Sequence, residues 1–275
     1  MKNDEQTALF SYRKAKLSSR SSLHSHKVYE MYFLLSGRRR YFIDHRTYDV
    51  EAGDIIMIPP NTAHQSLKIP HTPSDGMHER YLLCPEINHI PDELKSCFSR
   101  NHYHLSPEDS KLIKHELEAI GKEIEANDDF SFYMYSAGLF KILTLLLRNY
   151  TNESDIQTSS EKRIDRIIGN VQSYIENNVN NNISLSSIAD QFGVTENYLS
   201  AAFKSNLGIG FSEFLTKTRI AKSIKLLAKN DIPISEIAIR CGFNNGNYFS
   251  TVFKKAMKVT PTQYRENTNP ISEKR

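Results

Sequence analysis

The spacing of hydrophobic and polar positions divides the chain into two parts. From Leu23 to about residue 60, apolar residues come in short runs and alternations, separated by turn-forming residues such as Ser36-Gly37 and Pro59-Pro60. Short strands at this spacing predict an all-β sandwich or barrel. The predicted strands cover 28–35, 41–43, 48–50 and 55–58. Residues 1 to about 22 are polar and basic, and predict a terminal arm.

Two longer segments after residue 105 have helical spacing. Ser106-Pro107 followed by two acids predicts a helix from there to about residue 125, because serine caps a helix and acids favour its first turn. A second helix is predicted for 130–150. It is too apolar to be exposed on all sides, so part of it must pack on the β part, and the rest is available to a second subunit. Its apolar positions are Phe132, Tyr135, Leu139, Ile142, Leu143 and Leu146.

The last 115 residues predict a series of helices joined by capping residues. A first packing helix covers 164–175, Ser184 caps a short helix to Phe192, Thr195 caps the next, and a long helix covers 211–229. Ser235 is predicted to cap another short helix, which Gly242 ends. Glycine suits the tight corner of a helix-turn-helix because it takes positive φ at little cost.

A helix predicted from about Asn245 to Met257 separates apolar from polar residues. Tyr248, Phe249, Val252 and Phe253 predict a buried face. The opposite face is small and polar and carries a cation, which suits a helix in a DNA groove. Its residues are Asn247, Ser250, Thr251 and Lys254.

The same pattern occurs earlier in the chain. Ile188, Ala189 and Gly193 lie 49 residues before Ile237, Ala238 and Gly242. Tyr198, Ser200, Phe203 and Lys204 lie 50 residues before Tyr248, Ser250, Phe253 and Lys254. The one-residue shift falls in the turn, where insertions are tolerated. Two matching helix-turn-helix units separated by one helix are a far stronger signal than one.

The C-terminal part resembles the AraC/XylS family of bacterial transcription regulators over roughly the last hundred residues. The residues that carry the resemblance lie in both units and in the helix between them. They are Ile188-Ala189, Gly193, Tyr198-Leu199-Ser200, Phe203-Lys204, Arg219-Ile220-Ala221, Leu226-Leu227, Ile237-Ala238, Gly242-Phe243, Tyr248-Phe249-Ser250, Phe253-Lys254 and Pro261 through Tyr264-Arg265.

The resemblance implies that outward residues of both recognition helices contact bases. Asn197 and Asn247 could pair with adenine edges, and Ala201 or the Thr251 methyl could meet a thymine methyl. Family members often carry arginine at these last two positions, so this chain is expected to lean toward A/T sites. The full predicted DNA-binding set is Asn197, Ser200, Ala201, Lys204, Asn247, Ser250, Thr251 and Lys254, with the two lysines assigned to phosphates.

Two N-terminal motifs resemble those of cupin barrels. They are His24-x-His26-x3-Glu30-x6-Gly37 and Gly53-x5-Pro59-x4-His64, with Asn61 where glycine is usual. The two histidines and Glu30 can share one strand face, and His64 comes from another strand, so all four could converge inside the barrel. They could hold a divalent metal, line an effector pocket without one, or satisfy one another. The Arg38-Arg39-Arg40 run is predicted to be a strand with exposed cations, with a ligand anchor as the alternative. His71 and His78 are predicted to lie in a loop without a role.

Composition narrows the class of protein. Of 275 residues 39% are hydrophobic, and no apolar run approaches the roughly 18–20 residues that span a bilayer. Three widely spaced cysteines and no signal-peptide core predict a reducing, cytoplasmic setting. The net charge of +3 is uneven: 16 Lys and Arg stand against 10 Asp and Glu from Ser160 onward, and 19 against 22 before it. A basic C-terminal part fits nucleic acid.

Together these features predict an α+β chain of two domains. A cupin-like β-barrel with following helices (1–150) would sense a small molecule and dimerise, a linker would cover 151–160, and an all-α tandem helix-turn-helix domain (161–275) would bind promoter DNA. The predicted function is an effector-controlled transcription regulator, an activator that meets RNA polymerase, with no required cofactor. Two alternatives stay open: a metal-dependent cupin enzyme fused to a DNA-binding domain, and a constitutive DNA-binding protein whose barrel only dimerises.

Overall fold

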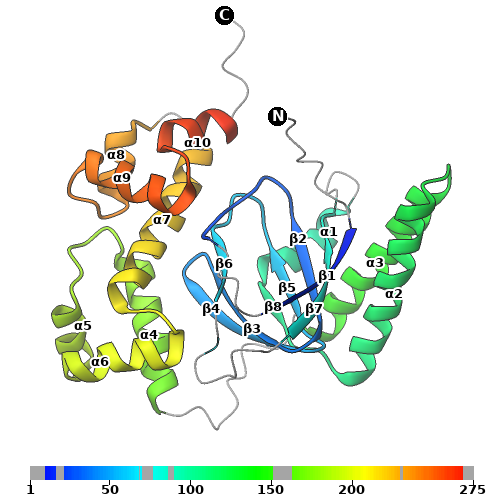
Figure 1. The fold of residues 1–275 in the computed structure, drawn as a ribbon, viewed down its shortest axis with the longest axis horizontal. Coiled ribbons are helices and arrows are strands. Elements are labelled where there is room, and N and C mark those ends of the chain that lie inside the picture. The colour runs from blue at the N-terminus through cyan, green and yellow to red at the C-terminus, as the bar shows by residue number, and fades with distance from the viewer. Residues whose placement is uncertain are drawn as a thin grey trace, which may run out of the picture.

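All the described strands come from the first 103 residues, and the later part of the described chain is mostly helical (Figure 1). The computed structural model describes residues 10–16, 22–67, 69, 77–85, 90–150, 163–229 and 232–268. The predicted linker 151–160 and His71 lie outside these ranges. None of the described helices is both long and apolar enough to cross a membrane.

The strands form two antiparallel sheets that face each other as a barrel. The five-stranded sheet has the order β1-β7-β2-β5-β8 and the three-stranded sheet the order β4-β3-β6. Their bounds are β1 Phe10–Lys16, β2 Glu30–Ser36, β3 Arg38–Ile43, β4 Arg46–Glu51, β5 Ile55–Ile58, β6 His64–Leu67, β7 Met77–Leu83 and β8 His102–Tyr103. The prediction of a terminal arm was wrong for 10–16, because β1 pairs with β7 along its whole length.

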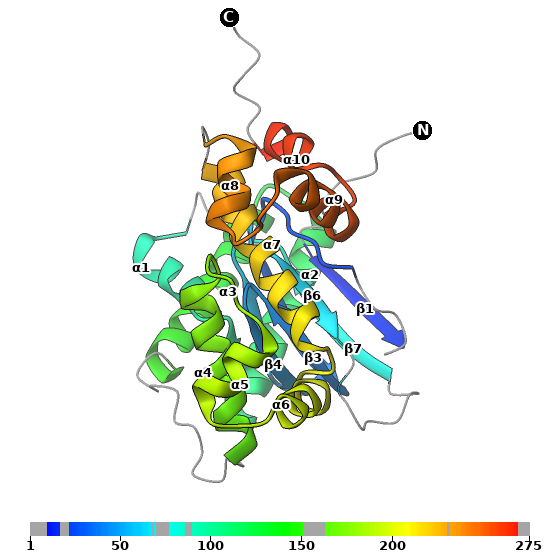
Figure 2. The ribbon, with the colours of Figure 1, turned by 90° about the vertical axis from the view of Figure 1, so that its left-hand side faces the viewer.

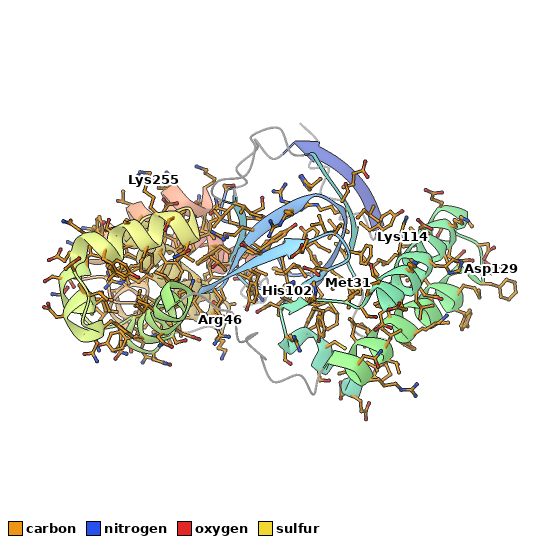
Figure 3. The ribbon with its side chains drawn as sticks, turned by 90° about the horizontal axis from the view of Figure 1, so that it is seen from below. Met31, Arg46, His102, Lys114, Asp129 and Lys255 are labelled. Carbon is orange, nitrogen blue, oxygen red and sulfur yellow. The ribbon has the colours of Figure 1, made fainter. Side chains whose placement is uncertain are left out.

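Alternation along the strands sorts side chains between the barrel interior and its two outer faces. On β2, Tyr32 and Leu34 join a cluster inside the barrel, whereas Met31 and Phe33 pack outward with the helices that come after the barrel in the chain. Seen from below, the barrel lies between these helices and the C-terminal helices (Figure 3). Each sheet is therefore covered on its outer face by a different helical layer.

The helices beside the five-stranded sheet are α1 (Asp92–Lys95), the 3-10 turn η2 (Ser96–Ser99), α2 (Pro107–Ala126) and α3 (Ser131–Tyr150). The predicted cap of α2 is confirmed, since the Ser106 side chain accepts a hydrogen bond from the Asp109 amide. Leu139, Ile142, Leu143 and Leu146 of α3 are buried in the shared core. The start of α3 is different: its aromatic residues point into solvent.

The C-terminal domain is all helical. Its elements are α4 (Arg163–Asn178), α5 (Leu185–Phe192), α6 (Glu196–Ala202), the π-turn η3 (Phe203–Leu207), α7 (Phe211–Lys229), α8 (Ile234–Arg240), α9 (Gly246–Met257) and α10 (Pro261–Thr268). Ser184, Thr195 and Asn245 cap α5, α6 and α9 with their side chains. The prediction that Ser235 caps α8 was wrong: Pro233 holds the cap position, where its fixed φ starts the helix without a side-chain hydrogen bond.

The helical domain packs against the outer face of the three-stranded sheet, with α7 running across it (Figure 2). Leu23, Phe42, Ala63 and Leu67 of the barrel belong to the same hydrophobic cluster as the helical core. Phe42 meets Phe214 of α7 edge to face, with ring centroids 5.9 Å apart. The two domains therefore share an apolar contact as well as polar ones.

Candidate functional site

The buried face of helix α9 and a side-chain cap at its start fix the helix in the domain. Phe249 and Phe253 are fully buried, and the Asn245 side chain accepts hydrogen bonds from the amides of Asn247 and Tyr248 at 2.7 and 3.3 Å. Predicted contact residues of this unit lie on the other side: Asn247, Thr251 and Lys254 are exposed, and Ser250 is half-buried. This face is open to solvent.

The first unit repeats the arrangement. Leu199 and Ala202 anchor α6, and Asn197, Ser200 and Ala201 are exposed on its other side. Lys204, also exposed, lies in η3 rather than in α6. The structure therefore presents all eight predicted DNA-binding residues at or near the surface, four from each unit.

Two of these side chains are already engaged with their own helix. The Ser250 hydroxyl donates to the Gly246 carbonyl at 2.9 Å, and the Thr251 hydroxyl donates to the Asn247 carbonyl at 3.0 Å. Each hydroxyl oxygen can still accept a hydrogen bond, so these residues suit donors on base edges. The Asn247 side chain makes no such hydrogen bond among the described contacts, so its carbonyl oxygen and its NH2 group are both available.

The prediction that Tyr248 is buried was wrong. Its side chain is 62% exposed, and Tyr198 at the matching position is 41% exposed. Both stand beside the predicted contact residues, which makes them surface aromatics missed by sequence reasoning. The repeat could have revealed this exposure. In each unit the tyrosine directly precedes a buried residue, and two consecutive side chains of a helix point in different directions.

The two units are held at a fixed separation by α7 and the chain after α4. Arg219 of α7 donates hydrogen bonds to the carbonyls of Val179 and Asn181, and its guanidinium lies 5.8 Å from the Phe243 ring. Gly242 completes this junction. It has φ +81°, and a Cβ there would overlap the Val179 carbonyl oxygen. The predicted glycine corner is confirmed.

In the barrel, the four predicted pocket residues converge. The His24 and His64 rings are 4.1 Å apart and those of His26 and His64 4.9 Å apart, centroid to centroid. Glu30 Oε2 lies 2.9 Å from His26 Nε2 and 3.4 Å from His64 Nε2. Ligand atoms of His26, Glu30 and His64 all lie within 4.8 Å of one another, whereas His24 is outside that set.

The hydrogen bonds of this cluster fit a cation. His26 Nδ1 is 2.9 Å from the Val28 carbonyl oxygen, and His64 Nδ1 is 2.9 Å from that of Thr62. Donation to these carbonyls places the proton on each Nδ1 and turns the Nε2 lone pairs toward Glu30. Two lone pairs facing a carboxylate need a proton or metal ion between them, and backbone-anchored imidazoles with one carboxylate are a familiar set for divalent metals.

The same contacts change the acidity of the cluster. Burial favours the neutral acid, but the two imidazoles outweigh it and hold the pKa of Glu30 far below its usual range. Burial disfavours a charged imidazole at His26, yet the hydrogen bond with Glu30 raises the pKa of His26 above its ordinary value. Burial and then His64 lower the pKa of His24. The carboxylate is thus ionised and ready to face a cation.

The arginine run was predicted to be exposed, and this was wrong for two of its three members. Arg38 is exposed, but Arg39 and Arg40 are 5% and 8% exposed. Arg39 points into the barrel, and Arg40 points toward the helical domain, where it donates to the Asn206 carbonyl and pairs with Asp49. His78, expected in a loop, is a buried residue of β7.

Polar contacts join the barrel to three helices of the C-terminal domain: α4, α7 and α10. His45 links Asp44 at 2.8 Å to Glu176 of α4 at 2.7 Å, and Lys225 of α7 pairs with Asp44. The Ser25 hydroxyl lies 2.7 Å from the Tyr264 hydroxyl of α10. Asp44, His45, Glu176 and Lys225 line a cavity of about 690 Å³ between the domains. Arg46 and His102, labelled in Figure 3, also belong to its lining.

Comparisons with known proteins agree with this division. A helix-turn-helix domain model matches residues 188–267, and a cupin domain model matches residues 15–68. The HTH-type transcriptional activator RhaR of Escherichia coli O139:H28 is 26% identical over 253 residues, which are 88% of this chain and 86% of the relative. RhaR of Salmonella dublin is 23% identical over 255 residues, 90% and 87% of the two chains.

Two solved structures are similar to parts or all of the chain. The C-terminal domain of AraT, a response regulator from Geobacillus stearothermophilus, is 42% identical across 42% of this chain and 94% of that one, with a TM-score of 0.38. ToxT from Vibrio cholerae O395 is 17% identical across 96% and 99%, with a TM-score of 0.39.

The named relatives are regulators rather than enzymes, so the enzyme alternative is set aside. Two domain models, each on the part of the chain that has the matching fold, and relatives aligned along most of their length lead to one conclusion: the chain belongs to the AraC/XylS family of DNA-binding transcription regulators.

Proposed function

We propose that this regulator activates transcription when a small molecule occupies its barrel, and that its two recognition helices bind neighbouring major grooves of a promoter. Successive major grooves on one side of DNA lie about 34–36 Å apart. The long helix α7 and the Arg219 junction give the two units a fixed spacing. Asn197 and Asn247 bind adenine edges in this proposal, and Lys204 and Lys254 bind phosphates.

The DNA part is tested by selecting bound sequences from random duplexes with the intact chain. The whole chain is used because Leu23, Phe42, Ala63 and Leu67 of the barrel complete the helical core, so an isolated 160–275 fragment would expose that surface. Enrichment of two A/T-leaning blocks one helical turn apart is expected. Recovery of unselected sequences at low salt would contradict specific binding.

One observation carries the proposal of effector control. In the barrel strands beside the helical domain, one residue faces the barrel interior and the next faces the helical domain. On β6, Ser66 faces inward, and Gln65 faces outward and accepts a hydrogen bond from Lys217 of α7. Ser25, between the clustered histidines 24 and 26, contacts Tyr264 of α10. A molecule that shifts the interior shifts these contacts, which is the difference in state that control requires.

The proposal is tested by measuring effector-dependent DNA affinity and melting temperature on the same proteins. His26→Ala with His64→Ala should abolish the effector response of the intact chain without changing its basal DNA affinity. If the double variant melts like wild type and still responds fully, the effector binds elsewhere. The cavity between the domains is then the next candidate. Unchanged DNA affinity across all compounds that bind would favour the constitutive alternative, in which the barrel only dimerises.

The chemistry of the histidine cluster supports a divalent metal within the same barrel. His26, His64 and Glu30 are its ligands in this proposal, with His24 beside them. Such an ion would neutralise Glu30 and offer a coordination position to an oxygen of a small molecule. Dialysed protein should retain about one equivalent of metal, and His64→Ala should lose it while His115→Ala, a surface histidine of α2, keeps it. Equal retention by both variants would contradict the site.

Exposed aromatic residues support a homodimer. Phe130, Phe132, Tyr133 and Met134 at the start of α3 are 73, 45, 69 and 57% exposed. Such a contiguous apolar group on a surface is typical of an interface. Tyr133→Ser with Met134→Ser should convert a dimer to a monomer in analytical ultracentrifugation, and a wild-type chain that sediments as a monomer at micromolar concentration would contradict the dimer.

The activator role is supported by the names of the relatives, which are transcriptional activators. Activation implies a contact with RNA polymerase, and promoter binding implies a cytoplasmic site of action. A reporter assay with the selected operator placed upstream of a weak promoter tests the sign of regulation: expression rises if the chain activates and falls if it represses.

A further inference from the structure

The barrel interior holds two arginines whose charges no described carboxylate pairs. Arg39 of β3 is 5% exposed, and Arg80 of β7 is half-buried with its Nε fully shielded from solvent. Among the described residues, neither guanidinium lies within ion-pair distance of an acidic side chain, and the Nε of each has no hydrogen-bond partner. An unpaired charge in such a place is costly, so it is retained only where something offsets that cost.

The hydrogen-bond partners of these arginines are a histidine ring and hydroxyl groups rather than carboxylates. Arg39 Nη1 lies 2.7 Å from His78 Nε2, and its Nη2 donates to the Ser66 hydroxyl. Arg80 Nη1 donates to the Tyr41 hydroxyl at 2.9 Å, and its guanidinium stacks 4.4 Å from the centre of the Tyr32 ring. These contacts fix the direction of each side chain. Burial disfavours the charge of Arg80, but Tyr41, Tyr32 and the charge of Glu30 outweigh it and raise the pKa of Arg80. No described carboxylate pairs directly with either guanidinium.

The two buried carboxylates described in the barrel, Glu30 and Asp54, are already engaged. Asp54 lies 3.0 Å from His102 Nε2 and 2.8 Å from His104 Nδ1. Glu30 faces His26 and His64 and accepts a hydrogen bond from the Tyr32 hydroxyl at 2.9 Å. Burial is the main cause that lowers the pKa of Arg39, and the charge of Arg80 lowers it further, which indicates that the two cations repel each other across the same space. No carboxylate of the described interior is therefore left to pair directly with either arginine.

We propose that Arg39 and Arg80 bind the carboxylate of a small organic acid, which is the effector of this regulator. Guanidinium groups match a planar carboxylate through paired N–H donors. The buried apolar side chains of the same cluster, Leu34, Ile43, Ile56 and Ile58 among them, would contact its hydrocarbon part. The inference rests on the proposed effector control and adds the chemical class of the effector.

The strand that carries Arg39 also gives this binding a route to the DNA-binding domain. The next residue, Arg40, points outward and donates to the Asn206 carbonyl of η3, directly after the first recognition helix. Ser66 and Gln65 repeat this pairing on β6, where Gln65 meets Lys217. An anion bound between Arg39 and Arg80 would shift β3 directly and β6 through Ser66, and the outward side chains of these two strands contact the helical domain.

The test uses the full-length protein and a panel of small carboxylates from acetate and benzoate to dicarboxylates, each beside its uncharged amide at matched ionic strength. At a hundredfold excess over Kd, a bound carboxylate should raise Tm by about 5 °C or more, and its amide should not. Arg39→Met and Arg80→Met should each lose the rise, and Arg38→Met, the exposed neighbour on the same strand, should keep it.

Stability of the unliganded variants gives a second readout that does not need the right acid. Because burial disfavours the charge of Arg39, Arg39→Met should leave Tm unchanged or raise it, whereas the loss of a structural arginine would lower Tm by several degrees. The inference is overturned if no carboxylate raises Tm, if amides act equally, if the Met variants still respond, or if Arg39→Met melts well below wild type.

DNA affinity separates this inference from the proposed effector control. A carboxylate that raises Tm through Arg39 and Arg80 yet leaves operator affinity unchanged would sustain the anion site and contradict effector control. An uncharged compound that alters operator affinity through the barrel, with no carboxylate binding, would sustain effector control and contradict the anion site.

Discussion

The helical domain and the barrel place their polar groups in opposite ways. The recognition helices bury aromatic residues such as Phe249 and Phe253 and expose amides, hydroxyls and lysines. The barrel buries Glu30, Arg39, His64 and His78 in its interior. A macromolecule such as DNA can be reached only from the surface, and a small molecule is held best where water is excluded. The placement of polar groups thus suits the surface of one domain to DNA and the interior of the other to the proposed small molecule.

The largest expected effect concerns the junction that keeps the two units in register. Gly242→Ala should cost about 3 kcal/mol or more in the free energy of unfolding, because positive φ and overlap with the Val179 carbonyl act together. Gly193→Ala, at φ +63° with open space around it, should cost only about 1 kcal/mol. Chemical denaturation of both variants measures the loss of unfolding free energy. Equal losses would mean that the backbone at the junction shifts to make room for the added methyl group.

The next effect separates specificity from affinity on α9. Asn247→Ala should cost about 1–3 kcal/mol of DNA binding at one base position and relax preference there. Lys254→Ala should weaken binding to every sequence alike and reduce the salt slope by about one unit. Titration of an operator and its single-base variants at several salt concentrations distinguishes them. A uniform loss from Asn247→Ala would put its side chain on phosphate rather than on a base.

A smaller effect tests the contact between the two regions. Tyr264→Phe keeps the ring, which packs against Phe253 at 5.7 Å, and removes only the hydroxyl that meets Ser25. It should cost about 1 kcal/mol in stability and weaken the effector response. Ser25→Ala should act in the same way, and the double variant should add little to either single one. Fully additive losses would show that the two hydroxyls do not interact.

The smallest effect checks the surface that sequence reasoning assigned wrongly. Tyr248→Ala should change the free energy of unfolding by less than about 0.5 kcal/mol because the side chain is exposed, whereas Phe249→Ala should cost about 3–5 kcal/mol. Thermal melts compare the two directly. A large loss of stability from Tyr248→Ala would place this tyrosine in the core.

Much of the helical domain could be predicted because its signals are local. Caps at Ser184 and Thr195, the glycine corner at Gly242 and the paired apolar positions each act within a few residues, and the repeat supplied two independent copies of them. The helix α7 was predicted with its observed bounds for the same reason. Tyr248 failed because a tyrosine suits a buried or an exposed position, and only packing decides between them.

The barrel was harder to predict, because long-range pairing sets its strands. β1 and β7 pair across about 70 sequence positions, and their own sequences carry no apolar alternation strong enough to reveal it. Arg39 was misjudged because three arginines in a row look like a solvated run. Alternation with Tyr41 and Ile43, two and four residues later, placed it on the inward face.

By itself the sequence determined the order of the elements, the two helix-turn-helix units, their outward residues and the convergence of His26, Glu30 and His64. Periodicity, capping and motif spacing are properties of neighbouring residues, and the chain carries them in any context. Only the tertiary structure decided that the three-stranded sheet packs on α7, that Ser25 meets Tyr264, and that Arg39 and Arg80 share the interior without a described carboxylate to pair them. These contacts depend on which distant segments of the chain come together. The burial that results then sets how much free energy each charge costs.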